Sequence, residues 1–382
     1  MSEKKKALAV LWSPKSLLDF LWYYEAYGKT QYEYDVLVLT AGADENGKWK
    51  TRIYDYVVNA KIFNNISVYK ESYVDQSLIK KLKVVTKMAW YAIRGKQKEY
   101  CVTELMPWID YRKYNQIVTV FLPTIFSGEL VTLSETLEVV LLEDGVKDYV
   151  KHRKWPTIKS IKEMGLQTEM AGLFLSKMGY ADPTTSYDFK PTRNCVKFSS
   201  MPQKLLYREY KMVKQLNDMS LVDEKTYSTL VEQTFSYDIT GLKADCVFFT
   251  APLNEDFKID KSVAYDFAKY IAKKMGKGTL LLKKHPRDEM VYEFPKEIEV
   301  IEVPQNVPAE LLLEKLDNVE VYFAFSSTFM KEIRNLNPKI LFDASKANKM
   351  YNTEKIWNDM KTLELGRENL IDITEEKVKD GI

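Results

Sequence analysis

Strands and helices alternate through residues 279–343 at a spacing that allows few folds. Apolar runs predict four strands there, over Thr279–Lys283, Glu297–Glu302, Glu320–Phe325 and Lys339–Asp343. Two segments with helical character, Val307–Leu316 and Phe329–Leu336, separate the later strands. Strands that alternate with helices in this way indicate a parallel, doubly wound sheet. In such a sheet, ligands bind outside the carboxyl ends of the strands.

The beginning of the chain has the same pattern. Ala7–Trp12 is predicted to form a buried strand, Pro14 to begin a helix, and Asp35–Thr40 to form the next strand. The turn between the first strand and the helix lacks the G-x-G-x-x-G fingerprint, so we expect no dinucleotide there. Two more apolar strands follow at Gln116–Leu122 and Leu137–Leu142. The sequence therefore predicts an α/β protein with two Rossmann-like domains.

The periodic pattern blurs between residues 154 and 243, where four prolines interrupt it. We place the connection between the two domains in this stretch. The predicted divisions are an N-terminal domain over residues 1–165, a connecting and partly helical region over 166–243, a C-terminal domain over 244–345 and a helical tail over 346–382.

Composition limits the classes of protein to which the chain can belong. Apolar residues make up 46% of it, enough for sizeable cores, and a net charge of +2 argues against a nucleic-acid binder. The three cysteines are too widely spaced for a disulfide framework or a metal motif. The apolar run near the N-terminus is too short for a signal peptide, and no run approaches the about 20 apolar residues that span a membrane. We therefore expect a soluble cytoplasmic protein.

The segment Lys80–Lys98 is basic and amphipathic. Its simplest interpretation is a solvated helix face. The alternative is a contact with an anionic membrane surface or an anionic polymer. A membrane contact would give the protein a peripheral position at the inner face of the cell membrane.

His285, one of two histidines, has the more informative surroundings. It follows a predicted strand, precedes Pro286 and has cationic neighbours in Lys283, Lys284 and Arg287. These cations disfavour a charged imidazolium unless an anion is bound. A bound phosphate would make His285 a donor to a phosphate leaving group, although a lone histidine is more often a structural residue.

Three hydroxyl residues, Ser326, Ser327 and Thr328, stand between a predicted strand and a predicted helix. The backbone N–H groups and the dipole at a helix start favour an anion. The same residues also serve as N-caps, and the two roles are compatible.

Acidic residues give the other candidate positions, each with two interpretations. Glu143-Asp144-Gly145 follows a predicted strand of the first domain. It is either an ordinary turn or the source of a carboxylate that takes a proton from an attacking hydroxyl. Glu310 is either a favourable charge in the first turn of a helix or an acceptor for a ribose diol.

Several catalytic motifs are absent from the sequence. It has no P-loop, no H-E-x-x-H and no G-x-S-x-G, and no D-x-D that would bridge a metal to a diphosphate. The residues that are present suit a metal-free transferase with a base, an acid and a helix terminus.

Taken together, these motifs resemble those of bacterial sialyltransferases of the two-Rossmann (GT-B) type. Members carry a D/E-D/E-G motif in the first domain, then an H-P motif and an S-S/T motif in the second. The matching residues, in the same order, are Glu143-Asp144-Gly145, His285-Pro286 and Ser326-Ser327-Thr328. Lys283 and Pro308-Ala309-Glu310-Leu311-Leu312 add to the resemblance. The pattern is similar to both the family-52 capsule and lipooligosaccharide enzymes and the polysialyltransferases.

The resemblance implies inverting, metal-independent transfer of sialic acid from CMP-sialic acid to a glycan acceptor, a galactoside or a sialoside. It implies no cofactor beyond this donor. Two domains would face a cleft, with the acceptor on residues 1–165 and the nucleotide sugar on residues 244–345.

Roles for individual residues follow from the resemblance. Glu143 or Asp144 would be the general base, and His285 would stabilise or protonate the departing CMP phosphate. We prefer Glu143 to Asp144 because the strand fixes it better. The donor-binding set would be Lys283, Pro286, Glu310, Ser326, Ser327 and Thr328.

Other functions fit the same residues. A transferase of this architecture could use CMP-Kdo or a CDP-polyol. A non-catalytic module could keep a cleft that binds a nucleotide or a glycan, although retention of acids and His285 argues against it. A membrane-surface scaffold built on Lys80–Lys98 is a third alternative.

Overall fold

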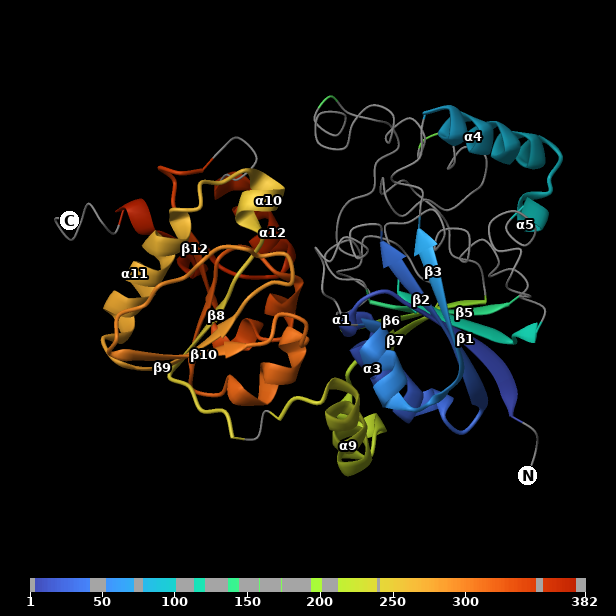
Figure 1. Ribbon diagram of the computed structural model, residues 1–382, viewed down its shortest axis with the longest axis horizontal. Helices are drawn as coiled ribbons and strands as arrows, with labels where there is room; N and C mark the ends of the chain where they lie inside the picture. Colours follow the sequence, from blue (N-terminus) through green and yellow to red (C-terminus); the bar gives the residue numbers. More distant parts are fainter. Residues whose placement is uncertain are drawn as a thin grey trace. The chain divides into compact units, whose positions relative to one another are not determined.

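The structure, a computed structural model, describes residues 4–41, 53–71, 78–100, 113–120, 137–143, 158, 173, 194–200, 212–238, 241–347 and 353–375. Within these ranges the chain divides into two compact units, with the division between Phe235 and Ser236. Each unit is built around one parallel sheet (Figure 1).

The sheet of the first unit has the strand order β3-β2-β1-β4-β5-β6-β7 among the described residues. The strands are β1 Lys5–Leu11, β2 Tyr32–Ala41, β3 Phe63–Glu71, β4 Gln116–Val120, β5 Glu138–Leu142, β6 Cys195–Ser199 and β7 Val213–Gln215. All neighbouring strands pair in parallel. The chain leaves β1 in one direction and returns to its other side at β4, so the switch point of this sheet lies between β1 and β4.

The helices described in the first unit are α1 Pro14–Tyr23, α3 Ile53–Ala60, α4 Leu78–Ile93, α5 Gln97–Tyr100 and α9 Glu224–Phe235. Helix α1 begins as the sequence predicts. The Ser13 hydroxyl accepts a hydrogen bond from the Ser16 backbone N–H (3.1 Å), and Pro14 occupies the first helical position. Its apolar face buries Leu17 and Phe20 completely, which fixes the turn after β1 at the edge of the sheet.

The sheet of the second unit has the order β10-β9-β8-β11-β12-β13. The strands are β8 Cys246–Phe249, β9 Gly278–Lys283, β10 Ile298–Val303, β11 Glu320–Phe323, β12 Lys339–Phe342 and β13 Leu370–Asp372. These pairs are also all parallel. Strand β8 lies in the middle, and all four of its side chains are buried. The switch point lies between β8 and β11.

Helices α10 Leu253–Phe257, α11 Val263–Met275 and α12 Thr353–Thr362 complete the second unit, with 3-10 turns at η8 Ala309–Lys315, η9 Thr328–Lys331, η10 Arg334–Leu336 and η11 Arg367–Asn369. Helix α11 ends at Gly276, whose φ of +69° is a conformation that favours glycine. One aromatic contact in the core is the stacked pair Phe249 and Phe323, with ring centroids 4.8 Å apart.

Counted from its own first strand, each sheet has the order 3-2-1-4-5-6, which is the order of a doubly wound nucleotide-binding fold. The first sheet then adds one more strand at β7. The predicted pair of Rossmann-like domains is therefore confirmed. The cleft between them stays a prediction.

Four of the predicted elements differ from the structure. The stretch 166–243, predicted as a connection, contributes β6 and β7 to the first sheet as well as α9. The stretch 346–382, predicted as a helical tail, contributes β13 as well as α12. These strands have three to five residues, too short for a clear alternating pattern. The segments 307–316 and 329–336 form 3-10 turns instead of α-helices, because Pro308 and Pro338 bound short connections between strands.

Of the helices in the described part of the chain, none combines the length and the apolar character that a membrane crossing requires.

Candidate active site

In the second unit, three neighbouring strands carry the candidate residues to one sheet edge. The order β9-β8-β11, with all pairs parallel, places the carboxyl ends of these strands side by side. Thr250 follows β8, His285 lies just beyond β9, and Ser326 lies just beyond β11. The switch point between β8 and β11 is at the same edge, which is where ligands bind in doubly wound sheets.

His285 begins a tight turn, which we call the His285 turn and define as residues 285–288. The Asp288 backbone N–H donates to the His285 carbonyl oxygen (2.9 Å) and closes a β-turn. Pro286 stands in the second position, where its fixed φ is preferred. The Arg287 backbone N–H donates to Nδ1 of His285 (3.1 Å), as it would to an Asn or Asp oxygen in an Asx-turn. A nitrogen that accepts this bond carries no proton, so the ring proton is on Nε2.

A polar chain behind the His285 turn fixes its backbone. The His285 N–H donates to the Thr250 hydroxyl (3.1 Å), and Thr250 in turn bonds to the Asp288 carboxylate. The same carboxylate accepts from the Met290 N–H and from the Tyr292 hydroxyl, both at 3.0 Å. Burial raises the pKa of Asp288, and these hydrogen bonds act in the opposite direction. The turn is therefore anchored to the core of the second unit.

Gln305 contacts the same turn from the segment after β10. Its side-chain amide donates to the carbonyl oxygens of Asp288 (2.8 Å) and His285 (3.3 Å). Its own carbonyl oxygen accepts from the ammonium of Lys283 (3.0 Å). Sequence reasoning missed Thr250, Asp288 and Gln305. The available signal for Asp288 was the H-P-x-D pattern of a β-turn. Gln305 lies far along the sequence from His285, and no local pattern marks it.

Lys283 ends β9 with its side chain inside the protein, and only 5% of its surface is exposed. The ammonium donates to the carbonyl oxygens of Lys284 (2.9 Å) and Gln305 (3.0 Å). Burial lowers the pKa of Lys283 to about 8, while the carboxylates of Glu310 and Glu302 act to raise it. Lys283 and Glu310, both predicted to bind the donor, are therefore close enough to interact.

The hydroxyl residues after β11 have partners in the protein. The Ser327 hydroxyl accepts from the Phe329 N–H (3.3 Å) and caps η9. The Ser326 hydroxyl donates to the Asp359 carboxylate in α12 (2.9 Å). Thr328 is the first residue of η9. The predicted capping role is confirmed for Ser327, and the turn that it caps has four residues. Anion binding by these residues stays a prediction.

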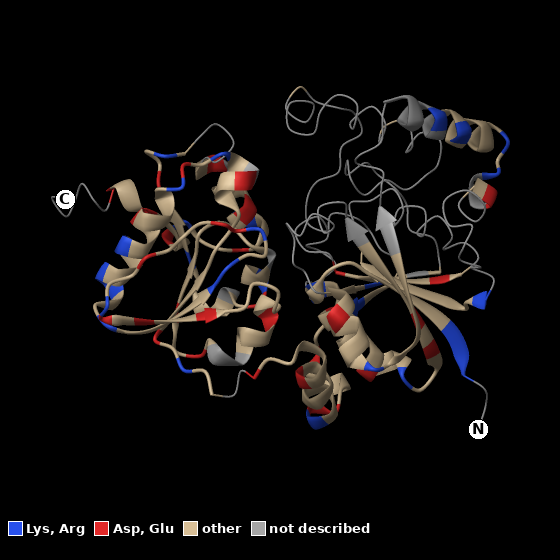
Figure 2. Cartoon of the chain, in the orientation of Figure 1, with Lys and Arg blue, Asp and Glu red and all other residues tan. Residues whose placement is uncertain are grey.

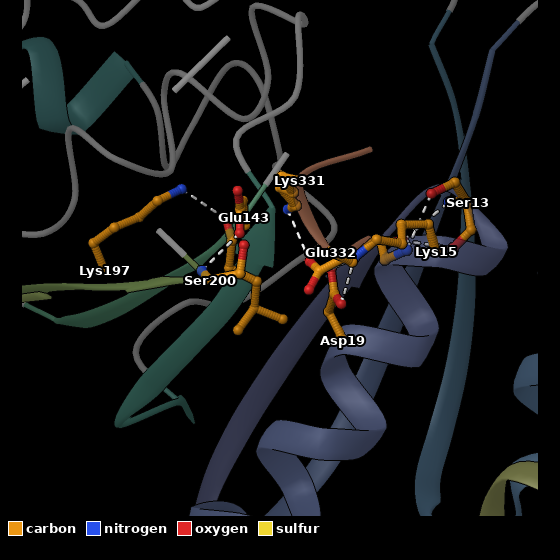
Figure 3. A network of polar contacts seen from close by, with 10 residues as sticks. Ser13, Lys15, Asp19, Glu143, Lys197, Ser200, Lys331 and Glu332 are labelled. Atoms are coloured by element: carbon orange, nitrogen blue, oxygen red, sulfur yellow. Dashed lines mark hydrogen bonds and ion pairs between the residues drawn. The ribbon is translucent and has the colours of Figure 1, made fainter. Parts of the chain in front are cut away.

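In the first unit, Glu143 directly follows β5 and is 2% exposed. The Ser200 backbone N–H donates to its Oε2 (2.8 Å), as Figure 3 shows. Lys197, fully buried in β6, donates from Nζ to the carbonyl oxygen of Leu142 (3.0 Å). Residues in and just after β6 thus hold both the Leu142 carbonyl and the Glu143 side chain in place. Its partner in the predicted motif, Asp144, lies outside the described residues.

A partly buried ion pair lies at the start of α1, beside the switch point of the first sheet. Nζ of Lys15 contacts both carboxylate oxygens of Asp19 at 2.5 Å, and Asp19 is 1% exposed. Figure 3 shows Lys15 next to Ser13, the N-cap of α1, with Asp19 further along the same helix. Lys15 and Asp19 were not among the predicted site residues. Their spacing of four residues was the available signal.

The basic segment around Lys80–Lys98 forms α4 and α5. Lys83 and Lys87 are exposed on α4, and the same helix face continues at Trp90, because residues three and four apart are neighbours. Trp90 is 46% exposed and Ile93 87% exposed. Helix α4 contains no acidic residue, and the charged residues that Figure 2 colours on it are basic. The described side chains thus combine positive charge with exposed apolar surface.

Among the described residues, no group of three or more His, Cys, Asp or Glu side chains is placed to hold a metal ion. The absence of a metal requirement stays a prediction.

No family model matches this chain, and neither does any curated protein. Solved structures share its general architecture at low similarity. A UDP-N-acetylglucosamine 2-epimerase from Listeria monocytogenes has a TM-score of 0.47 and 12% identity, covering 99% of this chain and 87% of that one. A glycotransferase of kitacinnamycin has a TM-score of 0.46 and 10% identity, covering 98% and 87%. MurG from Acinetobacter baumannii has a TM-score of 0.42 and 9% identity, covering 97% and 87%. Similarity at this level carries no argument about the chemistry of this chain.

Proposed function

We propose that this protein is a glycosyltransferase that moves sialic acid from CMP-sialic acid to a hydroxyl group of a glycan. The observation that carries the proposal is the His285 turn. It holds an imidazole with a protonated Nε2 at the carboxyl edge of a doubly wound sheet. The buried ammonium of Lys283 lies two residues before it. Both groups suit a phosphate.

The chemistry of the leaving group fits these two side chains. When the bond between the sugar and the phosphate oxygen breaks, the electron pair stays on the phosphate. CMP then carries a charge of about −1.5 to −2. Such a group needs stabilisation more than it needs a proton. His285 supplies a hydrogen-bond donor, and Lys283, with a pKa of about 8, supplies a positive charge at neutral pH.

The proton of the acceptor hydroxyl has to leave as the new bond forms, and a carboxylate of the acidic motif is proposed to take it. Glu143 is our first choice, because it directly follows β5 and the Ser200 N–H holds its carboxylate in place. Asp144 is the alternative base. Attack on the face opposite the phosphate would invert the configuration of the sugar.

The remaining donor contacts are part of the same proposal. Ser326, Ser327 and Thr328 would face the phosphate, and Glu310 would accept hydrogen bonds from the ribose. Pro286 would act by holding the His285 turn in shape.

Mass spectrometry of reaction products tests this proposal. The full chain is incubated with CMP-sialic acid and a panel of galactosides and sialosides, with and without EDTA. A product heavier by one or more sialic acid residues, formed equally in EDTA, is expected. CMP-Kdo and a CDP-polyol serve as competing donors. Transfer from CMP-Kdo or from the CDP-polyol, with none from CMP-sialic acid, would overturn the donor assignment. Binding of CMP without any transfer would favour a non-catalytic module.

A peripheral contact with the inner face of the cell membrane is a further part of the proposal, supported by α4. Basic residues on an exposed helix face attract anionic lipid headgroups, and an exposed Trp90 next to Ile93 suits the boundary between headgroups and acyl chains. A polyanion in solution would use the charges and leave these apolar side chains uncovered.

A further inference from the structure

We propose that Gln305 is a positioning residue that keeps His285 in one uncharged form, as a hydrogen-bond donor through Nε2. The inference rests on the proposed function for what His285 donates to. Its geometry stands on hydrogen bonds within the second unit alone.

The first step concerns the ring of His285. Its Nδ1 accepts the Arg287 backbone N–H inside a closed β-turn. A proton on Nδ1 would replace this acceptor with a second donor, and the Arg287 N–H would then lose its partner. The loss is unfavourable because this N–H is partly buried; a fully buried donor without a partner costs about 1–3 kcal/mol, the upper bound here. As long as the turn is intact, His285 is therefore a neutral ring with its proton on Nε2.

The second step concerns what keeps the turn intact. The His285 carbonyl oxygen accepts from both the Asp288 N–H and the Gln305 amide. The Asp288 carbonyl oxygen accepts from the same amide. The side chain of Gln305 thus joins the first and last residues of the turn, and its backbone carbonyl holds Lys283.

The consequence for the reaction is that His285 and the acceptor hydroxyl treat their protons differently. A neutral imidazole stabilises the departing phosphate through Nε2–H and keeps its own proton. The only proton that changes place is that of the acceptor hydroxyl, which goes to the carboxylate of the acidic motif. The electron pair of the broken bond stays on CMP, so charge and protons balance without a general acid.

The experiment uses the full chain labelled with ¹⁵N-histidine. Only two histidines, His152 and His285, give ring signals, and the variant His152→Gln assigns them. The expected result for His285 is one protonated and one unprotonated ring nitrogen, with Nε2 the protonated one. A ring that is protonated on Nδ1, or on both nitrogens, at neutral pH would overturn the inference.

Gln305→Glu tests the positioning role, because it keeps the size of the side chain and the backbone carbonyl but removes both donated hydrogen bonds. We expect a mixture of His285 ring forms and a loss of turnover of about tenfold to a hundredfold, since small misplacements have costs of this size. Asn306→Ala, at the next position, is the control and should change neither. Gln305→Ala shows whether the new charge of the Glu variant matters.

Failure of this inference is distinguishable from failure of the proposed function. The ring signals are recorded without any donor, so they report on the turn whether or not CMP-sialic acid is a substrate. Wild-type ring signals and turnover in both Gln305 variants would show that Gln305 has no positioning role.

Discussion

The burial of Lys283 needs a physical explanation. Removal of an ammonium from water is unfavourable, and its pKa of about 8, against an ordinary 10.5, corresponds to about 3 kcal/mol at ~1.4 kcal/mol per pKa unit. Two carbonyl oxygens hold the charged group in place. A buried cation two residues before His285 suits the phosphate contact that we propose for this site.

The first prediction concerns stability against pH. Between about pH 8 and 10.5 the folded state has released the Lys283 proton while the unfolded state keeps it. The free energy of unfolding should therefore rise with pH across this window, by about 3 kcal/mol from this group, and be independent of the group below it. In Lys283→Met this rise should be absent. Urea unfolding of wild type, Lys283→Met and the control Lys284→Met at pH 7.5 and 10 measures it; identical pH dependence in all three would contradict the prediction.

The second prediction concerns His285. In His285→Asn the amide oxygen can still accept the Arg287 N–H and keep the turn, while the Nε2–H group is lost. Turnover of CMP-sialic acid should fall about 10²–10³-fold, as for removal of one preorganised hydrogen-bond donor, and affinity for the nucleotide sugar should change little. The turnover of His285→Ala should fall at least as far. Steady-state kinetics and calorimetry with CMP measure the two effects, and near wild-type turnover in the Asn variant would refute the role.

The third prediction concerns the base. Glu143→Gln or Asp144→Asn should abolish transfer while CMP binding to the second domain is retained, because the amides keep the size of the side chains but cannot take a proton. Glu143→Gln can still accept the Ser200 N–H through its amide oxygen, so folding should be preserved. Transfer rates and CMP affinity are measured on both variants in parallel. Wild-type transfer by both would reduce the acidic motif to a turn, and loss in one alone would identify the base.

At the scale of the element, the strands of both sheets were largely predictable from the sequence. Buried strands such as β5 and β12 are apolar runs after their first residue, and local composition is sufficient to identify them. Short strands such as β7 depend on a partner in the sheet, which local composition does not contain. The candidate site divides in the same way. His285 can be selected from its residue type and its neighbours in the sequence. The role of Gln305 becomes visible only in the fold, which brings its segment next to the His285 turn.

The fourth prediction concerns α4. Replacement of Lys83 and Lys87 by Glu should abolish sedimentation with vesicles that contain anionic lipid, because each basic side chain near such a surface contributes about 1 kcal/mol. Trp90→Ala should weaken binding to the same vesicles through the loss of interfacial burial. The matched control replaces Lys273 and Lys274, which are exposed in the last turn of α11, by Glu. Equal binding by all proteins, or none by wild type, would eliminate the membrane contact.

At the scale of the molecule, the two sheets share one strand order but are completed by different segments. The second sheet is completed by a segment that returns after β12, through α12 to β13. Residues Ile356, Met360 and Leu363 of this segment are buried in the core of the second unit. The segment is thus an integral part of the domain.

The fifth prediction follows from this. A fragment over residues 236–382 should unfold cooperatively in urea, whereas a fragment over residues 244–345 should not, because it lacks this buried apolar surface and the strand β13. Circular dichroism during urea unfolding measures both. A cooperative transition in the shorter fragment would show that the segment after β12 is dispensable.

Strand β13 also has a consequence for synthesis in the cell. It is the last strand of the described part of the chain, so until residues 370–372 have left the ribosome, β12 has an unpaired edge with apolar side chains. Open edges of this kind pair with other chains and lead to aggregation. The nascent second domain therefore passes through an interval of vulnerability that ends only with the emergence of Leu370–Asp372. Slow translation or a premature stop within this interval should divert the protein to chaperones or into insoluble material.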